Sequence, residues 1–159
     1  MKAAHTLTAL LVALSMTGCG ADSEILTEGD YLFFERIGIG QAGALTDTAE
    51  WVLRDSTSWA EAQEQLQPLA AFEPVDFSQE VVIVVAIPTE SGGYHIELES
   101  VEEMEDHVLV SYLFHEPALD CITLSALALP FQAVSVKRFE GKPVRFERRT
   151  QKYECTWKQ

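Results

Sequence analysis

The sequence predicts an α+β domain that is mainly β: an antiparallel sheet or sandwich of about six to seven strands with one short helix packed on it. Short apolar or alternating segments recur along the chain, bounded by Gly, Pro or acidic residues. One segment, around Trp59, has apolar residues at helical spacing. Strands do not alternate with long helices, which disfavours parallel βαβ units.

The first elements follow from local composition. Residues 31–39 are rich in aromatic and β-branched side chains and predict a strand, after which Gly38, Gly40 and Gly43 predict a flexible loop. Residues 50–54 predict a second short strand. Together these segments give the domain two strands before any helix begins.

A helix is expected next, opened by Ser56, Thr57 and Ser58. Ser58 with Glu61 fits a capping box, in which each side chain binds a backbone amide of the first turn. Trp59, Ala62 and Leu66 form one apolar stripe, and Pro68 ends the helix. We expect Trp59 to anchor this helix on the sheet.

The central part of the chain carries the strongest strand signals. Residues 81–87 are continuously apolar and mostly β-branched, which predicts a central strand buried on both faces. Pro88 ends this strand, and the Gly92–Gly93 pair predicts a primed hairpin turn into the next strand. From Tyr94 onward the pattern alternates, with Ile96 and Leu98 on the face of Tyr94.

Three more segments complete the predicted fold. Residues 107–115 predict a strand with Val108, Val110, Tyr112 and Phe114 on one face, and residues 117–120 a loop. Apolar character resumes over residues 127–139, where Pro130 indicates an edge strand or the start of a strand. Residues 143–149 predict the last strand.

The N-terminal segment predicts export and lipid anchoring. Residues 1–18 combine a basic start, a short apolar run and small residues, which is typical of a signal peptide. Cys19 follows directly and resembles the acylated cysteine of bacterial lipoproteins, with an ordinary cleaved signal as the alternative. Residues 19–29 then form a tether, and residues 30–159 a single domain. The expected location is the cell envelope, at the outer membrane or cell surface.

Three cysteines fit an exported protein. Lipidation of Cys19 leaves Cys121 and Cys155, an even pair in an oxidising compartment, so we expect them to form a disulfide. Two unrelated free thiols are the alternative. A bridge here would hold the C-terminal segment to the loop after Pro117.

Charge limits the class of partner. The formal net charge is −14, and the basic residues after Arg54 all lie between Lys137 and Lys158. An acidic body repels phosphate, so nucleic acid is not an expected partner. The basic C-terminal segment either pairs with acidic strands of its own sheet, which we favour, or binds an acidic partner.

Several features recur together in the order of a known family. They include Trp59 in a short helix, residues 75–77, the hairpin signal Ser91-Gly92-Gly93-Tyr94 and the pair Pro130-Phe131 before a strand. In this combination the chain resembles the C-terminal domain of PrcB-type protease-complex subunits over residues 46–139. The resemblance implies a PrcB C-terminal-like domain in a bacterial lipoprotein that stabilises an exported protease complex. It does not imply an enzyme.

The function that follows is a non-catalytic, membrane-anchored module that binds an exported protein, with a protease complex as one class of partner. Candidate partner-binding residues are Ser91, Gly92, Gly93, Tyr94, Pro130 and Phe131, although a role in folding alone is the alternative. A protease inhibitor using the Cys121 loop, or a lipoprotein that binds a small ligand, is the second hypothesis.

Motifs for catalysis or metal binding are missing from the sequence. It contains no nucleophile elbow, phosphate loop, HExxH or paired CxxC. His95, His107 and His115 lie on predicted strands, but His107 and His115 would be roughly 26 Å apart on one strand. We therefore predict surface histidines, no metal site, no catalytic residues and no cofactor.

Overall fold

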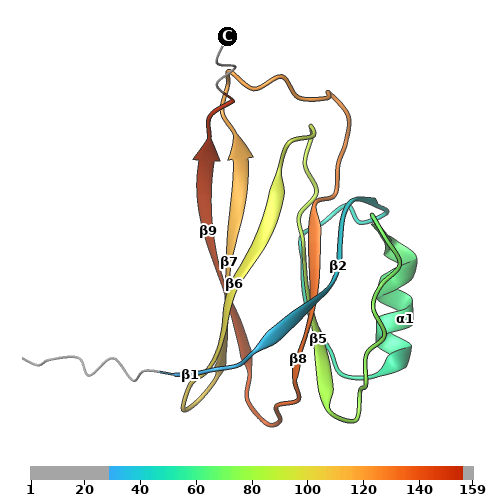
Figure 1. Ribbon diagram of the computed structural model, residues 1–159, viewed down its shortest axis with the longest axis vertical. Coiled ribbons are helices and arrows are strands. Elements are labelled where there is room, and N and C mark those ends of the chain that lie inside the picture. Colours follow the sequence, from blue (N-terminus) through green and yellow to red (C-terminus); the bar gives the residue numbers. More distant parts are fainter. Residues whose placement is uncertain (1–28, 156–159) are drawn as a thin grey trace, which may run out of the picture.

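Two β-sheets pack face to face, and one helix covers the outer face of the larger sheet (Figure 1). The structure is a computed structural model that describes residues 29–155. The predicted signal peptide, Cys19 and nearly all of the predicted tether therefore lie outside the described residues. The predicted fold class, mainly β with one short helix, is confirmed.

The smaller sheet has four strands in the order β1-β6-β7-β9. Their bounds are Asp30–Tyr31, His95–Glu103, Val108–Pro117 and Val144–Tyr153. Pairing is antiparallel except between β7 and β9, which are parallel. This parallel pair differs from the predicted antiparallel sheet. The chain reaches β9 from β8 of the larger sheet, so β9 starts at the same end of the smaller sheet as β7 and runs in the same direction.

The larger sheet has five strands in the order β3-β5-β8-β2-β4, all antiparallel. Their bounds are Ala49–Leu53, Glu80–Ala86, Phe131–Lys137, Phe34–Gly43 and Leu66–Pro68. Pro130 directly precedes β8, as predicted for a strand start, but β8 is central and is not an edge strand.

Strand β5 joins the two cores of the molecule. Val81, Ile83 and Val85 pack between the sheets, whereas Val82 and Val84 pack toward the helix. All five side chains are fully buried. The prediction of a central strand buried on both faces is confirmed, because each face of β5 has its own apolar neighbour.

Helix α1 (Ser56–Gln65) begins three residues earlier than the predicted capping box requires, because Ser58 as N-cap would make Trp59 the first helical residue. Asp55 is the N-cap, and its Oδ1 accepts hydrogen bonds from the amides of Thr57 and Ser58 at 3.0 and 2.9 Å. The Ser58–Glu61 capping box is therefore wrong. Trp59 and Ala62 are buried against the sheet, as predicted.

Two expectations for glycines are corrected by the fold. Gly38, Gly40 and Gly43 belong to β2 and not to a flexible loop. A Cβ at Gly40 would collide with the Phe131 ring and with the carbonyl of Gln67, so glycine here allows β4 and Phe131 to approach closely. A strand interior with glycines is easily mistaken for a loop on composition alone.

The predicted Gly-Gly hairpin is also wrong. Strands β5 and β6 lie in different sheets, and residues 87–94 cross between them. Gly93 has a positive φ of 94°, but Gly92 does not, so the turn lacks the left-handed pair that a Gly-Gly type I′ turn requires.

On the edge of β6 that faces away from β7, side chains of the larger sheet bind backbone groups of β6 and of the residue before it. Strand β1 pairs only with Glu102 and Glu103, so the rest of β6 has no strand beside it on that edge. The Leu98 amide donates to Oε1 of Gln132 at 2.9 Å, and Nε2 of Gln41 donates to the Tyr94 carbonyl at 3.1 Å. Two glutamines of the larger sheet thus satisfy backbone groups that a neighbouring strand would otherwise pair.

Candidate functional site

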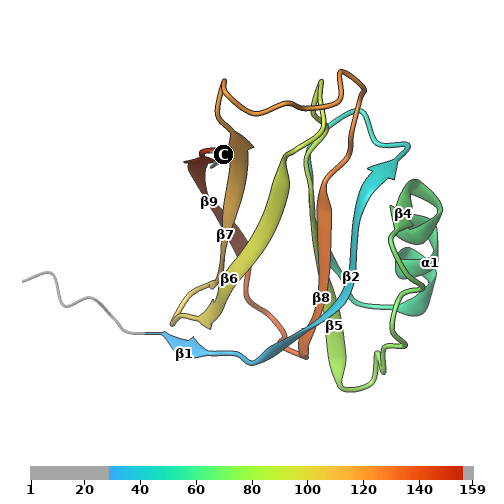
Figure 2. The same cartoon turned by 45° about the horizontal axis from the view of Figure 1, so that its top comes forward.

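Three connections meet at one end of the sandwich, which we call the apex: residues 44–48, 87–94 and 118–130 (Figures 1 and 2). Strand β1 and the turn between β6 and β7 lie at the opposite end, the base. An isolated bridge between Thr89 and Ala128 joins two of the connections. The apex is therefore assembled from segments that are far apart in the sequence.

The connection 118–130 exposes a run of aliphatic side chains. Leu119, Ile122, Leu124 and Leu127 are between 81% and 108% exposed. Single exposed apolar residues are ordinary, but several within nine residues of one loop indicate an interaction surface. No other segment among residues 29–155 exposes as many large hydrophobic side chains.

The same loop is held at several points. Cys121 and Cys155 form the predicted disulfide, with an S–S distance of 2.06 Å. The Leu124 carbonyl accepts from the Gly92 amide at 2.9 Å. Thr89 and Ala128 exchange backbone hydrogen bonds of 2.8 and 3.0 Å. The aliphatic side chains are therefore presented by a backbone that is already ordered, which lowers the entropic cost of binding.

Two hollows flank Leu127, each of about 490 Å³. One is lined by Gln41, Tyr94, His95 and the backbone around Gly92, Gly93 and Leu124. The other lies between residues 42–46, Pro88, Thr89 and Leu129. Neither lining contains Asp, Glu, Lys or Arg, and the size of each suits one or two apolar side chains of a partner.

The charged residues of the three connections are all acidic. The three connections contain Asp47, Glu90 and Asp120, all exposed, and no lysine or arginine. Lys152 near the end of β9 is opposite Glu116 in the β7–β9 register and two residues from Glu154. Because Asp47, Glu90 and Asp120 belong to the apex but line neither hollow, we call them the acidic rim.

The structure separates the predicted partner-binding residues into two groups. Ser91, Gly92, Gly93 and Tyr94 lie at the apex, where the Tyr94 ring stacks on Phe114 at 5.4 Å. Pro130 and Phe131 are buried, and the Phe131 ring packs near Phe72 on the helix side of the larger sheet. With 1% of its surface exposed, Phe131 has no face available to a partner.

Sequence reasoning missed the aliphatic loop. Residues 122–127 alternate apolar and small polar side chains, and this pattern merges with the strand that follows. The available signal was Pro130, because a proline inside an apolar run indicates the start of a strand and leaves residues 122–127 outside it.

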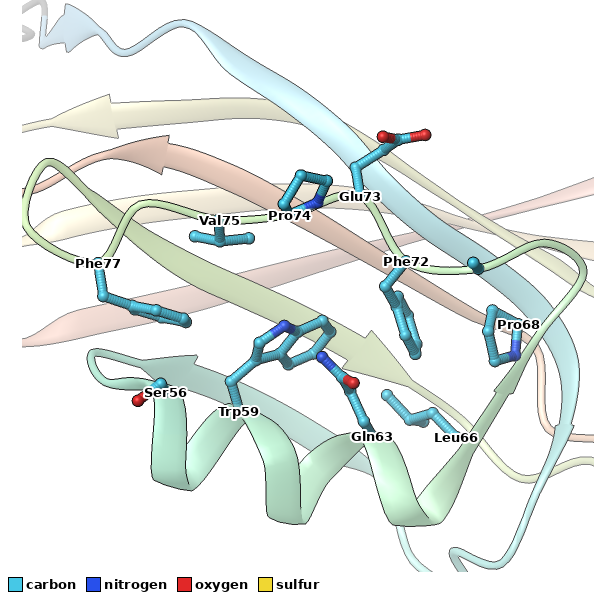
Figure 3. A pocket seen from close by; sticks show the side chains of 11 residues that line it. Ser56, Trp59, Gln63, Leu66, Pro68, Phe72, Glu73, Pro74, Val75 and Phe77 are labelled. Carbon is cyan, nitrogen blue, oxygen red and sulfur yellow. The ribbon is translucent and has the colours of Figure 1, made fainter.

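A larger hollow of about 610 Å³ lies beside helix α1 (Figure 3). Trp59 and Phe72 meet edge to face at 4.8 Å within it, and Val75 and Phe77 line its far side. Asp76 caps this segment, since its Oδ1 accepts from the Ser78 amide at 2.9 Å. These rings belong to the core under the helix, as predicted for Trp59.

Two of the three histidines within residues 29–155 come together. His95 and His115 are opposite in the β6–β7 register, and their rings stack at 4.0 Å. Burial, and secondarily the charge of His115, lowers the pKa of His95 from its ordinary value of 6.5. His107 lies at the base beside Asp106. Within residues 29–155 no three His, Cys, Asp or Glu side chains are grouped to hold a metal ion.

Tyr112 links the two sheets. Its hydroxyl donates to Oε1 of Glu50 on β3 at 2.7 Å. Burial, together with this carboxylate, raises the pKa of Tyr112, so the phenol stays protonated and acts as a structural donor. Every buried side-chain nitrogen and oxygen of the described part has a partner.

The basic C-terminal strand pairs with its own sheet, as predicted. Nε of Arg149 lies 3.1 Å from Oε2 of Glu99, and Nζ of Lys142 lies 2.9 Å from Oε1 of Glu103. Arg148 lies over the Phe114 ring and 3.9 Å from Glu116. These contacts leave the positive charge of β9 largely matched by β6 and β7.

Residues 81–137 match the family model described as PrcB C-terminal. The predicted resemblance is confirmed. The PrcB C-terminal match runs from β5 through β8, so it contains the whole of the connections 87–94 and 118–130. Helix α1 and residues 75–77, which the sequence comparison had included, lie outside it, as does Cys155. No curated protein and no solved structure matches the chain significantly.

Among residues 29–155, no helix combines the length and the apolar character needed to cross a bilayer.

Proposed function

We propose that this protein is a non-catalytic accessory module, anchored to the cell envelope through lipid on Cys19, that binds an exported protein through its apex. The observation that carries the proposal is the apolar, disulfide-held connection 118–130. A protease complex is the class of partner that the PrcB C-terminal resemblance favours. Residues 30–159 act as one domain in this proposal.

The arrangement of the chain supports an outward-facing apex. Strand β1, the first described element, lies at the base. Gly29 is ten positions after Cys19, and a chain of that length spans at most about 35 Å when extended. A lipid anchor at Cys19 would therefore hold the base near the membrane and leave the apex free to meet a partner.

The second candidate function is inhibition of an exported protease by the same connection. Inhibitory loops are rigid and protruding, and here the disulfide and the Gly92–Leu124 hydrogen bond give the loop that character. Stabiliser and inhibitor differ in what happens to the bound enzyme, so one assay separates them.

The test is an affinity pull-down from native envelopes with the full chain as bait. We expect one exported protein to be retained at near-stoichiometric amounts and to be lost with the double variant Leu124→Ser/Leu127→Ser. The matched control is Leu69→Ser, because Leu69 is 74% exposed but lies away from the apex on the segment after β4. Activity of a retained protease, measured with and without bait, separates stabilisation from inhibition. Equal retention by all baits would contradict the assignment of binding to the apex, and retention by none would contradict the accessory function itself.

A further inference from the structure

The partner's own chemistry can be read from the apex. We infer that the apex binds a polypeptide segment that carries apolar side chains flanked by Lys or Arg. This inference rests on the proposed function and narrows it to a class of partner sequence.

The first step concerns shape. Leu127 stands between the two hollows and is 88% exposed, so it forms a ridge between them. Leu124 borders the hollow on the Gly93 side. A segment crossing this ridge can place one apolar side chain in each hollow. Burial of two apolar side chains removes their surface from water, which favours binding of a segment that carries two such residues.

The second step concerns charge. Asp47, Glu90 and Asp120 come from three different connections of the apex, and none of them lines either hollow, so the negative charge lies outside the apolar centre. Their carboxylates are exposed and are not neutralised by any lysine or arginine of the connections themselves. A segment with Lys or Arg beside its apolar residues complements this rim, which raises both the association rate and the specificity.

The negative charge of Asp47, Glu90 and Asp120 disfavours three other occupants of the apex: a second copy of the chain, anionic lipid and nucleic acid. A second copy of the chain would bring an identical acidic rim against this one, and like charges across an interface disfavour binding. Anionic lipid headgroups and nucleic acid meet the same repulsion. The apolar centre alone would suit any of them, but the rim favours a cationic polypeptide.

The third step concerns order. The Leu124 carbonyl and the Gly92 amide hold the two connections together, and the Thr89–Ala128 bridge fixes the floor between the hollows. In addition, the Tyr153 hydroxyl donates to the Gly93 carbonyl and ties the end of β9 to the same place. The surface is therefore formed before a partner arrives.

The experiment selects a random dodecapeptide phage library on the oxidised full chain. Each round is depleted on the Leu124→Ser/Leu127→Ser variant, whose substitutions are at exposed positions and leave the core unchanged. We expect enriched sequences with at least two large apolar residues and a positive net charge. Their synthetic peptides should bind the wild-type chain at least tenfold more tightly than the double variant, and more weakly as salt rises.

A charge variant gives an independent readout. Asp47→Asn/Glu90→Gln/Asp120→Asn should weaken the enriched peptides several-fold and remove most of the salt dependence, while Leu69→Ser leaves both unchanged. Enrichment of neutral or acidic peptides, absence of enrichment over the depleted variant, self-association of the chain, or binding to phosphatidylglycerol vesicles in place of peptide would each overturn the inference. If the envelope pull-down still retains a protein that ignores the apex variants, the accessory function stands and this surface assignment fails.

Discussion

Gly92 and Gly93 are neighbours in the same connection but meet different backbone requirements. Gly93 has a φ of 94°, and a Cβ there would lie 2.9 Å from Cγ2 of Thr123 and 3.3 Å from Cγ of Pro117. Gly92 has an ordinary φ, and the nearest atom to an added Cβ is 3.8 Å away. The backbone conformation and close contacts therefore favour glycine at position 93, whereas position 92 has room for a larger residue.

We predict that Gly93→Ala lowers the free energy of unfolding by about 1–3 kcal/mol, because alanine is strained at positive φ and meets Thr123. Gly92→Ala is the matched control and should be neutral or stabilising by up to about 1 kcal/mol, since it reduces the entropy of the unfolded chain. Urea denaturation of both variants measures the difference. Equal losses would contradict the assigned backbone geometry.

The lowered pKa of His95 makes the free energy of unfolding depend on pH. Its pKa is lowered in the folded state from 6.5, so the folded chain binds fewer protons than the unfolded chain once the pH falls below that value. The stability linked to His95 is present above about pH 6.5 and is lost progressively as the pH falls toward the lowered pKa. Glu97, which binds His115, and Glu99 with Arg149 are the charged groups nearest this pair on the same face of the sheet.

We therefore predict that His95→Gln weakens the loss of stability between about pH 7.5 and about pH 5.5. The comparison is urea denaturation of wild type and variant at both pH values. His107→Gln, at the base and away from the stacked pair, should behave as the wild type. A pH response identical in all three proteins would show that His95 is not the group responsible.

At the scale of elements, the periodicity of apolar residues predicts which side chains are buried, but it does not predict which strands pair. The apolar run of β5, the helical stripe of α1 and the alternation in β6 and β7 each predicted the buried faces that the structure has. Alternation identifies which side chains share a face but contains no information about which strand lies alongside. For this reason the Gly-Gly signal predicts a hairpin where residues 87–94 cross between the sheets, and the strand patterns do not indicate the parallel β7–β9 pair.

The Gln132 side chain accepts a hydrogen bond from a backbone amide on the unpaired edge of β6. We predict that Gln132→Leu destabilises the protein by about 1–3 kcal/mol, because the buried Leu98 amide loses its acceptor while packing volume is kept. Hydrogen exchange of the Leu98 amide should accelerate more than that of other β6 amides. Gln67→Leu, an exposed substitution on β4, should change stability by less than about 0.5 kcal/mol. Unchanged exchange at Leu98 would show that Gln132 is not its essential partner.

At the scale of the whole molecule, the apex is built from three connections, with 38 residues between the first two and 23 between the last two. Sequence reasoning found one of its parts, Ser91 to Tyr94, and the disulfide that holds another. It also named Pro130 and Phe131 as candidate partner-binding residues, because this pair before a strand is part of the PrcB C-terminal resemblance. The larger sheet buries Phe131, and only the tertiary arrangement shows this.

The disulfide connects stability with the binding surface. Cys121 and Cys155 are separated by 34 residues. On the chain-entropy account we predict that Cys121→Ser/Cys155→Ser loses roughly 3–4 kcal/mol, measured by urea denaturation. The double variant should also lose hydrogen-exchange protection at residues 118–127 and bind its partner more weakly, because the loop must then be ordered on binding. Full affinity in the double variant would contradict the role given to the bridge.

The central claim is that the apex contacts an exported protein in the cell envelope. Site-specific photo-crosslinking in intact cells tests it most directly, with a photoreactive amino acid placed at position 124, 127 or 69 in turn. The account predicts a crosslink to one exported protein from positions 124 and 127, and none from position 69. The same adduct from position 69 alone, or no adduct from either apex position, would contradict it.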